Sequence, residues 1–387
     1  MDLVVLSEVR WSYFRTRKQF LLSRFPDRWR ILFAQPPGGG AEDPWEPKRE
    51  GNVVYFTVPF LKPGTRNAIY NQVTSTSIGR SIIERTAEAH LRKMLVKLGA
   101  EPLPTVLVSN IYAVRALSRL PRKLVVYDFN DSPFQFAGSP AWANEYWNRT
   151  RALVDLFFVV SEHYRSELAR ETDRPRILLG NGVEWERFRT PHPVPAELAS
   201  LPRPLIGYVG LMSHFLCFDT LEALRVNRRG GTLVLIGPGS PATDSAVQAL
   251  ASREGVRVLG SKPYEEIPAV MQALDVGLIP FRADDRHVTG INPNKIYQYL
   301  AAGTPVVSTP VLDLAEERPW ISYAKSPGEM VQAVHAVLDA KPDRDAAALR
   351  AKPHDWENLA LRMVTEIEKA VAGAPAGNRE RASEVSR

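Results

Sequence analysis

Short apolar runs alternate with helical segments along nearly the whole chain, and this alternation constrains the fold more than any other feature. The first half holds strand candidates at residues 3–6, 30–34, 53–58, 105–108, 124–127 and 156–160. A second series begins at residue 204 and continues with strands at residues 232–236, 256–259, 275–280 and 305–309. Strands that alternate with helices form parallel sheets covered by helices, so the sequence predicts the α/β class.

A proline-rich stretch with little periodicity separates the two series. It contains Pro191, Pro193, Pro195 and Pro202, and such a segment is typical of a linker. Two Rossmann-like domains joined in this way would face each other across a cleft at the carboxyl ends of their strands, where ligands bind. The predicted parts are an N-terminal domain (1–190), a linker (191–203), a C-terminal domain (204–353), a helix (354–372) and a disordered tail (373–387).

The amino-acid composition indicates the cellular compartment and the kinds of binding partner to expect. The single cysteine, Cys217, excludes an internal disulfide and a cysteine-based zinc site, which is consistent with a reducing cytoplasm. No uncharged apolar stretch approaches the ~18 residues of a membrane span, and the chain begins directly as a strand. We therefore expect a soluble cytoplasmic protein. A net charge of +6 favours anionic partners such as nucleotides, phosphate-bearing lipids or nucleic acid.

The segment from Gly290 to Gly303 carries more information than any other. A helix that begins near Asn292 has Pro293 in its first turn and ends just before Gly303. Its amino-terminal amides could bind an anion. Lys295 in the first turn opposes the helix dipole unless something negative binds there, and Gln298 lies one turn deeper on the same face, suited to hydroxyl groups. The alternative is an ordinary amphipathic helix with a solvated lysine.

A second candidate phosphate site follows the first strand of the second half. Gly207 and Gly210 bracket the end of this strand, and Ser213 and His214 follow in the loop. Close approach of backbone to a phosphate requires glycine, although a tight strand-to-helix turn explains Gly210 equally well. His214 could contact a diphosphate from this loop.

Two carboxylates are the candidates for acceptor chemistry in the first half. Asp128 and Asp131 follow the strand at 124–127. Either could orient an acceptor hydroxyl or accept its proton, or could instead cap the next turn.

Residues 1–40 mix an excess of basic residues with aromatic ones, which suits either contact with an anionic bilayer or packing on the domain core. No base-recognition motif is present, so we expect no nucleic-acid partner.

Several segments of the second half, occurring in the right order, resemble nucleotide-sugar-dependent glycosyltransferases of the GT-B fold, similar to family 4 (glycosyl transferases group 1). They are residues 206–210, 235–238, 258–268, 275–281 and 292–310. The first half agrees more loosely, at Val125–Asp128 and at Gly180–Val183. The resemblance covers residues 120–372 well and residues 1–119 only in outline.

This resemblance implies a metal-independent hexosyltransferase. It would move a sugar from a UDP-sugar to a hydroxyl acceptor, with retention of the anomeric configuration. The product would be a cell-surface glycan or a glycosylated metabolite. If the acceptor is lipid-linked, the reaction would take place at the inner face of the membrane. Lys295 would neutralise the diphosphate, the backbone of Gly290, Ile291 and Asn292 would support phosphate or donor sugar, and Gln298 would face the ribose. The nucleotide-sugar is a substrate, and no cofactor is implied. Asp343–Asp345 is not expected to bind metal.

The chain departs from the family pattern at two places. Family 4 members usually carry two glutamates separated by seven residues, whereas Gly290 and Gln298 occupy these positions here. The usual phosphate-binding arginine is missing from residues 211–217, and Arg282 or Arg286 could replace it. Two alternatives therefore stay open. One is a non-catalytic partner protein with a degenerate donor site, and the other is a sugar-nucleotide epimerase, whose catalytic carboxylates and histidine are not identified.

Overall fold

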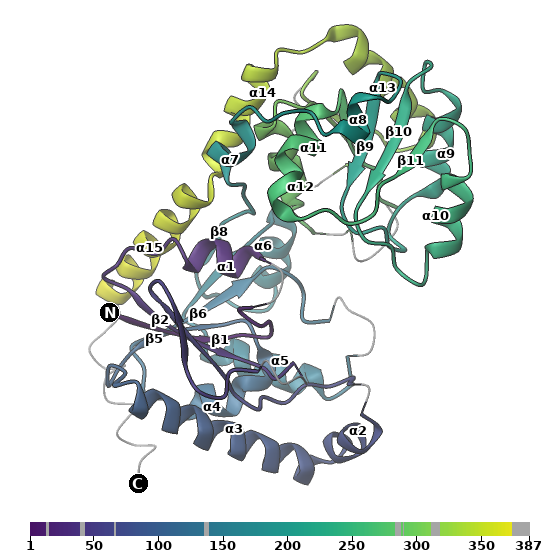
Figure 1. Ribbon diagram of the computed structural model, residues 1–387. Coiled ribbons are helices and arrows are strands. Elements are labelled where there is room, and N and C mark those ends of the chain that lie inside the picture. The colour runs from purple at the N-terminus through teal and green to yellow at the C-terminus, as the bar shows by residue number, and fades with distance from the viewer. Residues whose placement is uncertain are drawn as a thin grey trace. The chain divides into compact units, whose positions relative to one another are not determined.

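The computed structural model describes residues 1–12, 15–38, 43–65, 67–134, 139–282, 288, 290–310 and 318–373. Arg286 and the predicted tail beyond residue 373 lie outside these residues. The chain divides into two compact units, each built on its own sheet (Figure 1). The first holds residues 1–160, 164–179 and the chain from 359, and the second holds residues 161–163 and 180–358. The α/β class is confirmed. Segment 191–203 lies within the second unit.

The first unit has an eight-stranded sheet in the order β3-β4-β2-β1-β5-β6-β7-β8, in which only the edge strand β3 is antiparallel to its neighbour. The buried central strands are apolar on both faces, as expected where helices cover both sides of a parallel sheet. The strands are β1 (Asp2–Leu6), β2 (Arg30–Gln35), β3 (Lys48–Glu50), β4 (Val53–Thr57), β5 (Thr105–Val108), β6 (Leu124–Phe129), β7 (Leu156–Val159) and β8 (Arg176–Leu178).

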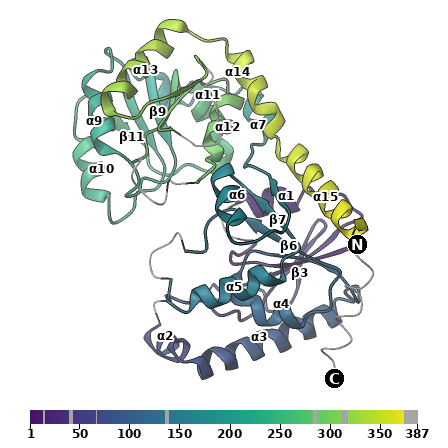
Figure 2. The same cartoon turned by 180° about the vertical axis from the view of Figure 1, so that it is seen from behind.

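Helices lie on both faces of this sheet. Figures 1 and 2 show α3, α4 and α5 together on one side and α1 and α15 on the other. No helix in the described ranges is long and apolar enough to cross a membrane. The helices are α1 (Arg17–Leu22), α2 (Ala68–Ser75), α3 (Ser77–Lys97), α4 (Val114–Arg119), α5 (Ala143–Leu153), α6 (Glu162–Ala169) and α15 (Trp356–Gly373).

The second unit has a six-stranded parallel sheet in the order β11-β10-β9-β12-β13-β14. The chain proceeds from β9 to β11 on one side and then returns past β9 to form β12, so the strand order reverses between β9 and β12. Ligands of such sheets bind at the carboxyl ends of the strands beside this point. The strands are β9 (Leu205–Val209), β10 (Thr232–Ile236), β11 (Val256–Val258), β12 (Val276–Ile279), β13 (Val306–Ser308) and β14 (Ile321–Tyr323).

The helices of the second unit form two groups. Helices α9 and α13 pack against each other, and α7, α11 and α14 each pack against α12 or its neighbours. The carboxylate of Asp343 accepts hydrogen bonds from the amides of Asp345 and Ala346, so it caps α14. The helices are α7 (Trp185–Arg189), α8 (Ala196–Ala199), α9 (Phe218–Val226), α10 (Asp244–Ala251), α11 (Ile267–Ala273), α12 (Asn294–Ala301), α13 (Pro327–Ala340) and α14 (Arg344–Ala351).

Candidate functional site

Helix α12 is fixed to strand β9 through one buried tyrosine. The hydroxyl of Tyr299 accepts a hydrogen bond from the amide of Val209 at 2.8 Å and lies 3.2 Å from the carbonyl oxygen of Gly207. Ile296 and Leu300 on the same helix are buried in the core of the unit. These contacts set the first turn of α12 beside the carboxyl end of β9, where the strand order reverses.

Lys295, in this first turn, lies over the loop that follows β9. Its Nζ is 5.2 Å from the ring centre of Tyr208 and 5.7 Å from that of Phe281. A Cβ atom built on Gly210, where φ is +148°, would lie 2.5 Å from this Nζ. The positive φ favours glycine at this position, and the missing side chain leaves room for the ammonium group beside the loop.

The Lys295 side chain is half-buried, and its ammonium group is partly withdrawn from water. Burial lowers its pKa to about 8, and no described carboxylate contributes to this shift. Within the described residues, no carboxylate lies at ion-pair distance from this group. A partly dehydrated cation at a helix N-terminus is suited to bind a phosphate or diphosphate group.

The loop after β9 is held in place by the neighbouring strand. The amide of Gly210 donates to the carbonyl of Ile236 at 2.8 Å. Further along, Ser213 is buried and its hydroxyl lies 3.0 Å from Nδ1 of His214, whose side chain is exposed. His214 and Arg282 line one cavity of about 760 Å³, together with Lys325. Of the predicted donor residues, the structure thus brings together Gly210 with Lys295, and His214 with Arg282.

Asn292, predicted to support the donor, has a structural partner. Its Oδ1 accepts hydrogen bonds from the amide of Asn181 at 2.9 Å and from the hydroxyl of Tyr297 at 3.1 Å. Its carbonyl accepts from Nδ2 of Asn181 at 2.7 Å. The side chain of Asn292 therefore ties the segment after β8 to the start of α12. Gly290 and Ile291 precede it in the same loop, and Gln298 is half-buried one turn beyond Lys295.

His354, which was not predicted as a site residue, supports this part of the unit. Its ring stacks on that of Tyr297, with the ring centres 4.0 Å apart and an angle of 21° between the planes. Burial lowers the pKa of His354 to about 4. No local motif signals this residue, because the stacking joins segments that are distant in the sequence.

We expect His354 to make the protein acid-sensitive. The unfolded chain, where the pKa is near the ordinary value of 6.5, binds a proton more readily than the folded chain. The free energy of unfolding should therefore fall as the pH drops from about 6.5 to about 4, by up to roughly 3 kcal/mol. Urea denaturation at both ends of this range measures the loss. His354→Phe, which keeps a ring against Tyr297, should reduce it, and an equal loss in this variant would contradict the assignment.

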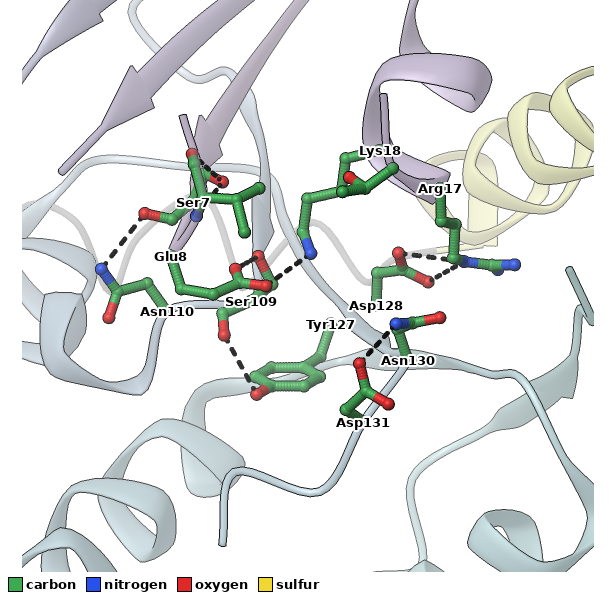
Figure 3. Close-up of polar contacts among 12 residues, drawn as sticks. Ser7, Glu8, Arg17, Lys18, Ser109, Asn110, Tyr127, Asp128, Asn130 and Asp131 are labelled. Atoms are coloured by element: carbon green, nitrogen blue, oxygen red, sulfur yellow. Dashed lines mark hydrogen bonds and ion pairs between the residues drawn. The ribbon is translucent and has the colours of Figure 1, made fainter. Parts of the chain in front are cut away.

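The first unit carries a polar cluster at the carboxyl ends of β1, β5 and β6, which Figure 3 shows. Nζ of Lys18 lies 2.6 Å from Oε1 of Glu8, and the hydroxyl of Ser109 also donates to Glu8. Nε of Arg17 lies 3.0 Å and 3.2 Å from the two oxygens of Asp128. Glu8 and Asp128 thus each have a cationic partner from α1.

Asp128 was predicted as a catalytic carboxylate, and the structure places it in a buried ion pair. The side chain of Asp128 is 2% exposed and that of Arg17 is 3% exposed. This geometry favours a structural role for Asp128, while its catalytic role stays a prediction.

The basic residues Arg17 and Lys18 of the N-terminal segment face the interior, and Trp11 and Phe20 are buried. The basic N-terminal segment therefore fits the alternative of packing on the core; Tyr13 and Phe14 lie outside the described residues.

Asp131 and Glu8 are the carboxylates of this cluster that stay partly accessible to solvent. Nδ2 of Asn130 donates to Asp131 at 2.7 Å. Withdrawal from water raises the pKa of Asp131 despite the opposing effect of Lys18. Asp131 lines a cavity of about 150 Å³, which it shares with Tyr112, Tyr127, Asn110 and other polar residues. A carboxylate with a raised pKa at such a cavity can accept a hydrogen bond or a proton from a hydroxyl group.

Part of the chain matches a known family model, and known structures share its fold. Residues 203–340 match the family model described as Glycosyl transferases group 1. The structure of sucrose-phosphate synthase from Thermosynechococcus elongatus aligns with a TM-score of 0.72 and 14% identity, covering 96% of this chain and 99% of that one. The chain has the GT-B fold of glycosyltransferases. The predicted resemblance is confirmed, and it extends to the residues before 120 that the sequence matched only in outline.

Further relatives agree with this placement. HepE from Anabaena, solved in complex with UDP, aligns with a TM-score of 0.64 and 14% identity over 95% of this chain and 100% of that one. The Bacillus subtilis protein TuaH, named for teichuronic acid biosynthesis, is 26% identical over 46% of this chain and 47% of its own. WcaL of Escherichia coli, named for colanic acid biosynthesis, is 25% identical over 51% and 50%. The chain spans about half the length of these two relatives.

Proposed function

We propose that the chain is a glycosyltransferase that moves a sugar from a UDP-sugar to a hydroxyl group of a growing polysaccharide or of a metabolite. The observation that carries this proposal is the half-buried ammonium group of Lys295, which lies against Gly210 at the carboxyl end of β9. There it can neutralise the charge that develops on the departing diphosphate. HepE was solved with UDP and with UDP-glucose, which supports a uridine nucleotide.

The acceptor is proposed to bind in the first unit. The cavity beside Asp131 holds carboxylate, amide and aromatic groups, which suit the hydroxyl groups and apolar faces of a sugar. Asp131 would orient the acceptor hydroxyl or accept its proton. TuaH and WcaL support polysaccharide synthesis as the setting, where the acceptor can be lipid-linked. The single cysteine, Cys217, supports a cytoplasmic location.

Two finer features are proposed on the resemblance. One is retention of the anomeric configuration, supported by a trehalose-6-phosphate synthase structure of the same fold that is named for glycosyl transfer with retention. The other is independence of metal ions, because Lys295 and the amides at the start of α12 can supply the positive charge. Within the described ranges, no group of three or more His, Cys, Asp or Glu side chains could hold a metal ion.

A thermal-shift screen tests the donor site. The purified protein is heated with UDP, GDP, dTDP, ADP and their common sugar conjugates, first with a chelator and then with Mg²⁺. A ligand that binds only the folded state stabilises it by about 2.7 kcal/mol at a concentration of roughly 100 times Kd. We expect UDP and one UDP-sugar to raise Tm by several degrees without metal. A shift that requires Mg²⁺ would overturn metal independence.

The second candidate function is that of a non-catalytic partner protein, favoured by Gly290 and Gln298 at the two usual glutamate positions. The same samples distinguish it. If none of the nucleotides shifts Tm, or if UDP-sugar binds and no acceptor preparation yields a transferred sugar, the degenerate site is supported. Conversion of the UDP-sugar to its epimer would instead support an epimerase.

A further inference from the structure

Helix α3 carries an unusual exposed stripe along its outer side. Ile78, Ile82 and Val96 are 74%, 60% and 81% exposed. Together with the exposed residues Arg85 and Lys93, they follow the helical spacing that places residues on one face. The opposite face packs into the core of the unit through Ala87, Leu91, Met94 and Leu95. The exposed face of α3 is thus apolar and basic, where a surface helix is normally polar.

Helix α2 extends this surface. Ile69 and Val73 are one turn apart on α2, and they are 75% and 43% exposed. The end of α2 packs closely on the start of α3, because a Cβ atom on Gly79 would lie 2.1 Å from the carbonyl oxygen of Val73. Figures 1 and 2 show α3 along the outer side of its unit with α2 at its beginning. The two helices therefore pack on each other, and both carry exposed apolar residues.

The exposed face of α2 and α3 carries basic residues and no carboxylate of its own, and the exposed Glu46 from another segment pairs with Lys97 at the end of α3. The sequence contains no aspartate or glutamate between Glu50 and Glu84. Glu84 is buried, and Glu88 is paired with Arg115 at 2.9 Å. No carboxylate therefore occupies the exposed stripe of α3 or any position of α2, while Arg85 and Lys93 are exposed on the stripe.

We propose that this α2–α3 surface, formed by Ile69, Val73, Ile78, Ile82, Arg85, Lys93 and Val96, docks on an anionic lipid bilayer. Helices that lie in a membrane interface combine exposed apolar side chains with lysine and arginine, and they bind through buried apolar area and attraction to anionic headgroups. The α2–α3 surface has both features and lacks carboxylates that the headgroups would repel. The proposal goes beyond glycosyl transfer and does not depend on which sugar is moved.

Vesicle co-sedimentation tests the proposal with the full-length protein. Vesicles of equimolar phosphatidylcholine and phosphatidylglycerol are compared with vesicles of phosphatidylcholine alone, at low and at high salt. We expect binding to the anionic vesicles that weakens with salt, since the headgroup attraction is screened. The variant Ile78→Glu/Ile82→Glu should bind at least about tenfold more weakly, because it places two carboxylates in the headgroup region and removes two apolar groups.

A matched control is available among exposed apolar residues elsewhere. Val226 on α9 and Leu361 on α15 are 61% and 53% exposed. The variant Val226→Glu/Leu361→Glu makes the same chemical change and should bind like the original protein. Circular dichroism confirms that both variants are folded. The proposal is overturned if the original protein stays in the supernatant with anionic vesicles, or if both variants lose binding equally. Dimers in sedimentation velocity that Ile78→Glu/Ile82→Glu dissociates would instead assign the surface to a second copy of the chain.

Discussion

Replacing Lys295 with alanine is expected to weaken UDP binding by about 2 kcal/mol or more, because a charge-assisted contact is lost in a site that excludes much of the water. Isothermal titration calorimetry measures the change. Arg253→Ala is the matched control, since it removes one exposed positive charge from the same unit. The control should bind UDP like the original protein, which separates a local contact from the general attraction of a basic domain.

The same interaction should depend on pH in a defined direction. The pKa of Lys295 is about 8 in the free protein, so the ammonium group is largely charged at pH 7 and loses its proton above pH 8. UDP binds the charged form, and its affinity should therefore fall up to about tenfold for each pH unit above 8. The Lys295→Ala variant should lack this part of the dependence. Equal UDP affinity of the variant and the original protein at pH 7 would refute the placement of Lys295 at the diphosphate.

The local structure around Lys295 could be predicted because its sequence signals are local. Pro293 and Gly303 bracket α12, which the structure places at Asn294–Ala301. Gly210 directly follows an apolar strand, and each of these signals acts within one or two turns of the chain. The longer strands are predicted for the same reason. Of the three-residue strands, β11 and β13 are predicted, whereas β3, β8 and β14 were missed; β3 consists of charged residues only, so no apolar pattern indicates it.

Side-chain pairing between distant segments could not be predicted. Asn181 and Asn292 are 111 residues apart, as are Arg17 and Asp128, and neither pair follows from propensity or spacing. This limit of the sequence matters most for the role predicted for Asp128. Its position at the end of a strand predicted a carboxylate available for catalysis, whereas its contact with Arg17 depends on how α1 packs on the sheet.

This ion pair is expected to support the fold of the first unit strongly. Arg17→Met leaves the carboxylate of Asp128 buried without its cation, which should lower the free energy of unfolding by about 3–5 kcal/mol. The double variant Arg17→Met/Asp128→Asn removes both charges and should recover a large part of this loss. Urea denaturation followed by tryptophan fluorescence measures the three proteins. Arg28→Met is the control, because the pair of Arg28 with Glu368 is half-exposed and should matter little.

The double variant also separates the structural from the catalytic role of Asp128. A buried pair whose only role is structural can be replaced by a neutral pair without loss of chemistry, so a stable double variant should retain glycosyl transfer in the presence of Asp131. If the double variant is as stable as expected but inactive, Asp128 takes part in the reaction and Arg17 positions it. If Arg17→Met leaves stability unchanged, the pair does not hold α1 to the sheet, and Asp128 returns as a candidate base beside Asp131.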